Sequence, residues 1–517
     1  MGVDTQTRPA PSPVPRSPGK PTATSEFKTR GEAPPVVPAL LPEERFLTAK
    51  SPGRVKLREA FALTVSITTN ALAAGLGEVR VPIIMEAGTL DVDILAPAFE
   101  TTEGSTRKLT VPATGPSGPV RFPLYAVETG INVIEINAWN GPVHVAALKV
   151  SIAVEQLPQP ERLTLGTASS DMDTRSPEEG EYTLEVVFEA EKNSYRFQLR
   201  SEQETLEPEY SPKLIAEQQI IITAIVNKLN GEARNINWFN GLQARTFLRN
   251  LGAELYNQLI PVNLQAALRN ARQRIKRLNI LSKSDALPWE IMFISDPVNG
   301  GGAFLAESAS VSRWQYGARA PKVLRRSPAY VIIPPGAPEH AMDELKWVAG
   351  LSGNAELVDD LDELLALIEA GGFSLLHFAA HNVSPQNVMD GFYIPFGNSR
   401  FDMTMFSSTL GASYATNNTL VFMNACTSAG AAPMATEMAG WADRFLKRGA
   451  AAFVGSLWEV RDKSAAKFAE AFYTALTAGK TIGEAMKAGR ETIGNDDPTR
   501  LAYTLFGNPL ATMPRGN

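Results

Sequence analysis

Apolar and polar positions alternate through residues 51–157, and no helical period interrupts them. Two faces of alternating apolar side chains stand out: Phe61, Leu63, Val65 and Ile67 in one segment, and Leu90, Val92 and Ile94 in another. The segment 131–154 has the pattern of a hairpin that turns at Asn140 and Gly141. Alternating segments separated by turns rich in glycine and proline predict a β-sandwich domain over these residues.

The pattern changes after residue 180. Strands are expected at 182–190 and 195–201, and apolar residues then recur three and four apart over 211–229 and 242–260, which predicts two helices. The apolar segment "ALPWEIMFI" closes this part of the chain. We expect it to extend over residues 181–325 as strands plus helices.

From residue 328 onward, strands and helices alternate. Continuous apolar runs typical of strands lie at 328–334, 355–358, 373–380, 418–425 and 451–460. Segments with helical period, the second of which begins with an Asp360 cap, lie at 338–351, 360–372, 434–449, 462–479 and 481–494. Strands buried on both faces give unbroken apolar runs, so residues 326–517 are predicted to form an α/β domain with a mainly parallel sheet flanked by helices.

Two stretches lack the apolar content of a folded domain. Residues 1–42 hold ten of the 37 prolines, and with few large apolar residues they cannot bury enough surface to offset the entropy of ordering. We therefore predict a disordered proline-rich tail over residues 1–50 and a linker over residues 158–180.

Composition narrows the class of protein. At 517 residues the chain is long enough for roughly three domains, and its net charge of −6 leaves no basic surplus for a nucleic-acid partner. One cysteine and four histidines exclude an intramolecular disulfide and a structural zinc pattern, which indicates a reducing compartment, most simply the cytoplasm. No apolar run reaches the roughly 18–20 residues of a membrane span, and the polar N-terminus lacks the apolar region of a secretory signal.

Two reactive side chains follow strands of the predicted parallel sheet. His381 comes after the strand 373–380, and Cys426, the only cysteine, comes after the strand 418–425, 45 positions later. The carboxyl ends of neighbouring parallel strands lie together, and a nearby histidine favours the thiolate form of cysteine. A helix predicted to begin near residue 434 adds a weak positive field on the same side. The alternative is a buried cysteine that only fills the core.

Five segments resemble the CHAT domain of the caspase-like cysteine peptidases, in the order that this family shows: "ALPWEIMF", "LLHFAAHN", "VFMNACTSAG", "FVGSLWEVRDKSAAKFAEAFYTALTAGKTIGEAMKAG" and "YTLFGNP". The resemblance covers about residues 180–515. It implies a caspase-like α/β fold and a His–Cys dyad at His381 and Cys426, with no metal or organic cofactor. The family commonly has a second histidine in the preceding strand, which gives His377 a packing or supporting role.

Two positions depart from the family pattern. Asn382 follows the dyad histidine where the family usually has glycine, whose backbone N–H helps to form the oxyanion hole together with that of Cys426. Asparagine tolerates left-handed backbone conformations better than most residues, so we expect the hole to persist. Asn424 stands where the related metacaspases have an Asp that binds a basic P1 side chain, so basic specificity is not supported at that position.

The substrate-binding candidates lie beside the cysteine, at the end of the predicted strand 451–460 and just after it: Asn424, Ser428, Trp458, Glu459 and Asp462. Glu459 and Asp462 offer a negative charge to a basic substrate, and the alternative for both is capping of the helix that begins near residue 463. The two remaining histidines have no catalytic group near them in sequence, so we expect a structural role for His144 and a surface position for His340.

The sequence and its resemblance lead to two functional hypotheses. The first is a cysteine endopeptidase that cleaves a partner protein. The resemblance suggests a regulated prokaryotic protease in a defence or signalling system, controlled by a protein or ligand through residues 51–325. The second is a catalytically silent CHAT-domain adaptor or scaffold that mediates protein–protein interactions. A nucleotide-dependent enzyme finds little support, because no strand is followed by a phosphate-binding glycine motif.

Overall fold

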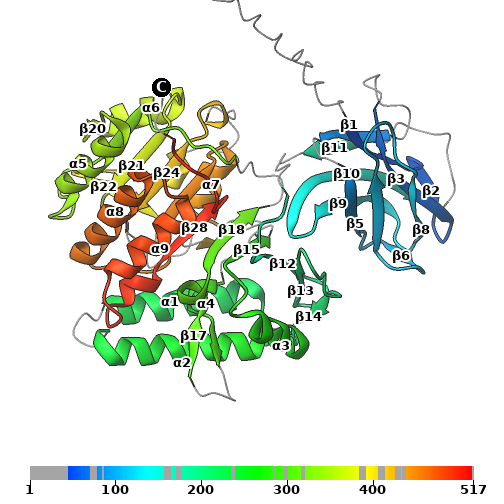
Figure 1. The fold of residues 1–517 in the computed structure, drawn as a ribbon, viewed down its shortest axis with the longest axis horizontal. Coiled ribbons are helices and arrows are strands. Elements are labelled where there is room, and N and C mark those ends of the chain that lie inside the picture. The colour runs from blue at the N-terminus through cyan, green and yellow to red at the C-terminus, as the bar shows by residue number, and fades with distance from the viewer. Residues whose placement is uncertain are drawn as a thin grey trace, which may run out of the picture. The chain divides into compact units, whose positions relative to one another are not determined.

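The computed structural model describes most of the chain (Figure 1). The described ranges are 45–69, 78–83, 87–156, 165–169, 176–234, 239–282, 287–295, 301–315, 321–383, 392–405, 414–425, 432–433 and 438–514. Cys426 and Ser428 lie outside these ranges, and so does the predicted tail up to residue 44.

Two β-sheets form the N-terminal part of the described chain. The five-stranded sheet has the order β4–β1–β3–β8–β6, with bounds Glu78–Ile83, Arg45–Lys50, Ala60–Thr68, Val120–Ala126 and Phe99–Thr101. The other sheet has the order β11–β10–β9–β5–β7, with bounds Leu165–Ser169, Val143–Glu155, Gly130–Asn140, Gly88–Leu95 and Thr106–Val111, and β2 (Arg54–Lys56) pairs with β10. Buried side chains from both sheets form one hydrophobic cluster, so the two sheets share a core.

The apolar faces predicted from the alternation point into this core. Leu63, Val65 and Ile67 in β3 are fully buried, and so are Leu90 and Val92 in β5. Successive side chains of a strand point to opposite faces, so every second residue reaches the core. The prediction of strands from the alternation of apolar residues is therefore confirmed for β3 and β5.

Three local predictions are corrected in this region. The hairpin turns at Gly141 and Pro142, because Asn140 still pairs with Val143 and Gly141 has a φ of 58°. Part of the predicted tail forms β1, which pairs with both β3 and β4. Part of the predicted linker forms β11, which pairs with β10. Composition predicts whether a segment can build a core by itself, but it does not report backbone pairing with a neighbouring strand.

A single eleven-stranded sheet organises the C-terminal part. Its order is β14–β13–β12–β15–β18–β28–β27–β24–β21–β19–β20. The bounds in that order are Glu209–Tyr210, Ser194–Ser201, Glu181–Glu189, Arg277–Ser282, Ser310–Gln315, Tyr503–Gly507, Ala452–Ser456, Leu420–Asn424, Leu375–Ala379, Ala329–Ile332 and Glu356–Val358. Neighbouring strands are parallel except for β13–β14, β12–β13 and β27–β28, so the prediction of a mainly parallel sheet is confirmed.

The last strand, β28, joins the two halves of this sheet. It pairs in parallel with β18 and runs antiparallel to β27. Residues 181–325 and 326–517, which we predicted as separate parts, therefore share one sheet. The pairing is invisible in the local pattern, because β28 and β18 are almost 200 residues apart in the sequence.

Nine α-helices are found among the described residues: α1 (Gln218–Arg234), α2 (Gly241–Leu259), α3 (Val262–Ala271), α4 (Leu305–Ser308), α5 (Ala341–Ser352), α6 (Leu361–Ala370), α7 (Trp441–Lys447), α8 (Asp462–Thr477) and α9 (Ile482–Thr492). The described residues also form three short antiparallel pairs: β16 (Phe293–Ser295) with β17 (Gly302–Phe304), β22 (Tyr393–Phe396) with β23 (Ser399–Asp402), and β25 (Ala432–Pro433) with β26 (Met438–Ala439). In the described part of the chain, no helix combines the length and apolarity needed to cross a bilayer.

Helices cover both faces of the large sheet (Figure 1). Leu420 and Phe422 of β24 belong to a hydrophobic cluster with side chains of α5, α8 and α9. Val421 and Met423 belong to another cluster with side chains of α2, α6 and α7. Because alternate residues of the strand face opposite layers, β24 is buried on both sides, which explains its unbroken apolar sequence.

The helix predicted over residues 434–449 is shorter in the structure. It begins at Trp441, while Met438–Ala439 form strand β26, and residues 434–437 lie outside the described ranges. A helix dipole acts mainly within the first turn. The positive field that we expected from a helix beginning near residue 434 therefore originates seven residues further along the chain.

Asp360 caps α6, as its sequence position predicts. Its carboxylate accepts hydrogen bonds from the backbone N–H groups of Asp362 (2.9 Å) and Glu363 (3.0 Å). We expect Asp360→Ala to lower the free energy of unfolding by about 1 kcal/mol in urea denaturation, because two helix-terminal N–H groups lose their acceptor. Asp359→Ala, at an exposed neighbour that does not cap the helix, is the control. Equal effects of the two substitutions would contradict the capping role.

Candidate active site

The carboxyl ends of four neighbouring parallel strands, β19, β21, β24 and β27, lie along one edge of the large sheet. β21 and β24 end level with each other, because Ala379 pairs with Asn424 in the last registered position. Just beyond this pair, the backbone N–H of Ala380 donates to the carbonyl oxygen of Asn424 (3.4 Å). His381 follows Ala379 by two residues and is exposed, and Cys426 follows Asn424 by the same two residues.

Asn382, the predicted oxyanion donor, is held by its side chain. Its Oδ1 accepts a hydrogen bond from Nε1–H of Trp441, the first residue of α7 (3.2 Å). Among the described residues, the non-glycine positions with positive φ are Arg58, Asn193 and Asn418. Asn382 therefore does not use the left-handed conformation that made asparagine attractive as a replacement for glycine.

Below this edge lies a set of five hydrogen-bonded side chains, which we call the buried network: Glu344, His377, Asn424, Tyr473 and Tyr503. Nδ1 of His377 lies 2.7 Å from the hydroxyl of Tyr473, and Nε2 lies 2.5 Å from Oε2 of Glu344. Nδ2 of Asn424 donates to Oε1 of Glu344 (2.8 Å), and the hydroxyl of Tyr503 donates to Oδ1 of Asn424. All five residues are buried, so His377 occupies the packing position expected for it.

The protonation states in the buried network follow from its partners. Burial, together with the nearby Glu344 carboxylate, raises the pKa of the Tyr473 hydroxyl well above its usual value, so this hydroxyl keeps its proton. His377 is its one hydrogen-bond partner among the described residues, so Tyr473 donates to Nδ1. His377 then carries its own proton on Nε2 and donates it to Glu344.

Sequence analysis missed three members of this network: Glu344, Tyr473 and Tyr503. A signal existed for Glu344, because it lies on the apolar face of α5, three residues after Ala341 and four before Val348, both of which are buried. An acid on a buried face requires hydrogen-bond partners. The two tyrosines gave no comparable signal, since tyrosine commonly packs in cores with its hydroxyl bonded.

The substrate-binding candidates differ in accessibility. Asn424 is buried, with both its amide oxygen and its amide nitrogen bonded in the network. Trp458 is fully buried, and its indole N–H has no hydrogen-bond partner among the described residues. Glu459 donates its backbone N–H to Oδ1 of Asn230 in α1 (3.3 Å), and Asp462 is the first residue of α8. Of the described candidates, only Glu459 and Asp462 are partly exposed.

One group of side chains has the donors of a metal site. Single ligand atoms of Glu339, His340 and Asp462 lie within 4.8 Å of one another. The group stands at the N-terminal ends of α5 and α8, where two helix dipoles favour negative charge and oppose a cation. Beside it, Asp343 lies 3.7 Å from His340, and a hydrogen bond from Lys346 lowers the pKa of the Asp343 carboxyl. Helix ends and Lys346 therefore account for these acids, and we assign no metal to them.

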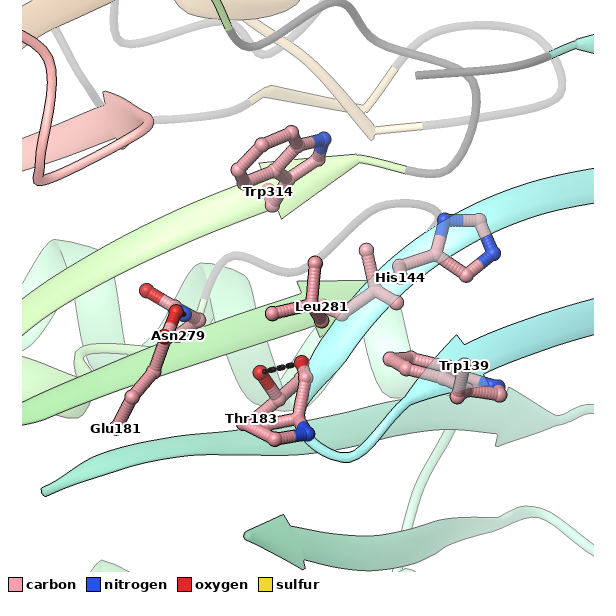
Figure 2. Close-up of a pocket in the computed structure, with 9 residues that line it drawn as sticks. Trp139, His144, Glu181, Thr183, Asn279, Leu281 and Trp314 are labelled. Atoms are coloured by element: carbon pink, nitrogen blue, oxygen red, sulfur yellow. Dashed lines mark hydrogen bonds between the residues drawn. The ribbon is translucent and has the colours of Figure 1, made fainter. Parts of the chain in front are cut away.

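A small pocket lies between the β9–β10 hairpin and strands β12, β15 and β18 (Figure 2). Its aromatic and aliphatic walls include Trp139, His144, Leu281 and Trp314. Glu181 lines it as well and accepts a hydrogen bond from Nδ2 of Asn279 (3.1 Å), which also lines it. His144 packs edge-on against Trp139 at a centroid distance of 4.8 Å, which fits the structural role expected for it.

The same hairpin is attached to β12 and β13 by polar contacts. Oγ1 of Thr183 donates to the carbonyl oxygen of Pro142 (2.7 Å). Arg200 is fully buried, forms an ion pair with Asp93 of β5, and places its guanidinium 4.4 Å from the centre of the Trp139 ring. A buried guanidinium needs such partners, because its desolvation is costly. The contacts therefore connect the N-terminal sheets to the edge of the large sheet.

Comparisons with known proteins extend this description. The CHAT domain family matches residues 249–508, and a domain of unknown function (DUF7363) matches residues 49–150. No curated protein matches the chain. Matching solved structures include the Arg-specific cysteine proteinase gingipain R (14% identity, TM-score 0.36, covering 52% of this chain and 74% of that chain). Another contains separase of Saccharomyces cerevisiae in complex with securin (12% identity, TM-score 0.37, covering 63% of this chain and 30% of that chain).

At these identities and TM-scores the likeness concerns the fold, and it supports no argument about activity. The CHAT match, by contrast, extends over half of the chain and includes His381, Cys426 and the strands that precede them. The chain belongs to the CHAT-domain family, the caspase-like family that its motifs resemble.

Proposed function

We propose that the protein is a cysteine endopeptidase of the caspase-like CHAT type, with His381 as general base and acid and Cys426 as nucleophile. The register of β21 and β24 carries this proposal, because Ala379 pairs with Asn424 and each reactive residue follows that pair by two positions. Neighbouring strands lie about 4.8 Å apart. Side chains that leave two such strands at the same level are within reach of each other.

The chemistry follows from this juxtaposition. His381 removes the thiol proton of Cys426, and the thiolate sulfur attacks the carbonyl carbon of the scissile peptide bond. The backbone N–H groups of Asn382 and Cys426 stabilise the negative oxygen of the tetrahedral intermediate. The imidazolium then donates its proton to the leaving amine, and a thioester remains on the sulfur. A water molecule activated by His381 hydrolyses this thioester and frees the thiol.

The substrate in this proposal is a partner protein, and the setting is a regulated prokaryotic protease of a defence or signalling system in the cytoplasm. Control enters through residues 51–325. There we infer that the two N-terminal sheets face each other as a β-sandwich, and the pocket beside Trp139 and Trp314 offers a surface for a regulatory protein or ligand. The steps above require no metal or organic cofactor.

The reactivity of the thiol tests this proposal. Because Cys426 is the only cysteine, every thiol adduct detected by intact mass reports on that residue. We expect iodoacetamide to label the protein rapidly at about pH 6, well below the ordinary thiol pKa of about 8.5, because His381 stabilises the thiolate. His381→Ala should reduce the rate at this pH by about ten-fold or more.

His340→Ala is the matched control, because it removes a histidine at the start of α5, after β19 in the same parallel sheet, without touching the dyad. It should label like the wild-type protein. Slow labelling that is identical in the wild type and in His381→Ala would contradict the peptidase and favour the adaptor.

A further inference from the structure

The buried network lies directly before the proposed dyad in both of its strands. His377 of β21 precedes His381 by four residues in the sequence, and Asn424, the last residue of β24, precedes Cys426 by two. The other members come from α5, α8 and β28, which are distant in the sequence. Five elements therefore contribute to the network that includes Asn424, the residue that ends β24.

The network leaves Asn424 a single orientation. Oε1 of Glu344 accepts from the amide nitrogen of Asn424, and Oε2 accepts from His377. The hydroxyl of Tyr503 donates to the amide oxygen of Asn424. If the amide were rotated by 180°, its oxygen would face the Glu344 carboxylate, which cannot donate, so that hydrogen bond would be lost and two oxygens would stand against each other.

A fully bonded polar network has a property that apolar packing lacks. Apolar side chains tolerate small shifts, whereas each hydrogen bond here fixes a distance and a direction. The positions of catalytic groups matter at this scale, since a displacement of about 1 Å can cost roughly a hundred-fold in rate.

We propose that Glu344, His377 and Tyr503 are positioning residues, which fix Asn424 at the end of β24 and so set the point from which Cys426 leaves the sheet. The catalytic consequence of this assignment rests on the proposed peptidase function. The same geometry assigns Asn424 to the support of the nucleophile, and not to the recognition of a substrate side chain.

Asn424→Asp tests the assignment with almost no change in side-chain shape. An aspartate oxygen would replace the amide nitrogen that donates to Glu344, so two buried carboxylates would face each other. We expect the melting temperature to fall and the iodoacetamide labelling of Cys426 at about pH 6.5 to slow by about ten-fold or more. A residue that only met substrate side chains would leave both quantities unchanged.

A second substitution should rescue the first. In the double variant Glu344→Gln with Asn424→Asp, the new amide nitrogen donates to the aspartate, and the new amide oxygen still accepts from His377. The hydrogen-bond pattern and the net charge are restored with donor and acceptor exchanged. We expect labelling at about pH 6.5 to return to within roughly three-fold of the wild-type rate. A purely steric role for these side chains gives no reason for such rescue.

Two tyrosine substitutions separate positioning from a general loss of buried hydroxyls. Tyr503→Phe removes a network donor, while Tyr414→Phe removes a fully buried hydroxyl that donates to the carbonyl oxygen of Ile368 (2.8 Å), ahead of the opposite end of β24. We expect slower labelling of Cys426 in Tyr503→Phe and an unchanged rate in Tyr414→Phe. Equal effects in the two variants would overturn the proposal.

Labelling at about pH 9.5, where an unassisted thiol with a pKa of about 8.5 is ionised, separates this proposal from the peptidase function. If the wild-type rate at low pH does not depend on His381, the peptidase function fails. The positioning role is then judged at high pH, where Asn424→Asp must alter the access of reagent to the thiol and the double variant must reverse the change. If Asn424→Asp labels like the wild type at both pH values, the positioning role fails, whatever the result for His381.

Discussion

We expect the replacement of Gly252 with alanine to lower the free energy of unfolding, measured by urea denaturation, by about 3 kcal/mol or more. Gly252 lies in the middle of α2 and is buried. A Cβ atom at this position would stand 1.7 Å from the carbonyl oxygen of Ile291 and 2.8 Å from its carbonyl carbon. Because both contacts are with backbone, no side-chain rotation can relieve them.

The neighbour that must move is itself firmly held. Ile291 ends a short 3-10 turn that begins at Trp289, and Trp289, Glu290 and Ile291 are all fully buried. Displacing the turn would disturb the core between α2 and the large sheet. The close approach of a helix to this turn thus gives a physical reason for glycine at this position.

Gly350→Ala in α5 is the matched control for this prediction. It has the same chemical change inside a helix, but a Cβ atom there would meet nothing within 4 Å. Alanine is favoured over glycine in helices by about 1 kcal/mol, so this variant should be slightly more stable than the wild type. Opposite signs for the two variants are expected, and a Gly252→Ala protein as stable as the wild type would refute the steric argument.

The second large effect concerns the buried ion pair of Glu290 and Arg313. Oε2 of Glu290 accepts from Nη2 of Arg313 (2.5 Å), and Oε1 also accepts from the hydroxyl of Thr504. Glu290 is fully buried and Arg313 is 3% exposed. Glu290 lies in the "ALPWEIMF" segment, which contributed to the family resemblance. Its carboxylate therefore connects this segment to Arg313 of β18 and Thr504 of β28.

We expect Glu290→Ala to cost about 3–5 kcal/mol of unfolding free energy, because it removes the buried carboxylate that pairs with the guanidinium of Arg313. It also removes a charge that favours the protonated form of Arg490, whose pKa burial lowers to about 10. Thermal unfolding followed by circular dichroism measures the effect.

Glu179→Ala provides the control for this prediction. Its partner Lys276 lies 3.1 Å away, but the two side chains are 87% and 56% exposed. Removing an exposed pair of this kind should change stability by less than about 1 kcal/mol. The double variant Glu290→Met with Arg313→Met should recover part of the loss, because no uncompensated charge then remains in the core. A Glu290→Ala protein no less stable than Glu179→Ala would show that the burial of this pair is unimportant.

The local sequence pattern determined the elements that carry the proposed site. Unbroken apolar runs predicted β21 and β24, and chain order placed His381 and Cys426 just after them. Both inferences depend on side-chain periodicity and on the rule that parallel strands align their carboxyl ends, which act over a few residues or a single sheet. The composition gives the acidic character and the single thiol of the chain directly. It did not predict that residues 45–50 and 165–169 add strands to the N-terminal sheets.

Only the tertiary structure decided what supports those elements. In the folded chain, β28 lies between β18 and β27, and Glu290 pairs with Arg313. Glu344 contacts Asn424, which lies 80 residues away in the sequence. Such partners depend on which surfaces come into contact when the layers pack. A buried polar group needs hydrogen-bond partners, but many different side chains can supply them, so the local sequence does not identify the partner. The sequence alone therefore predicted which residues follow β21 and β24, and the packing of α5, α8 and β28 determined that Asn424 is buried in a hydrogen-bonded network.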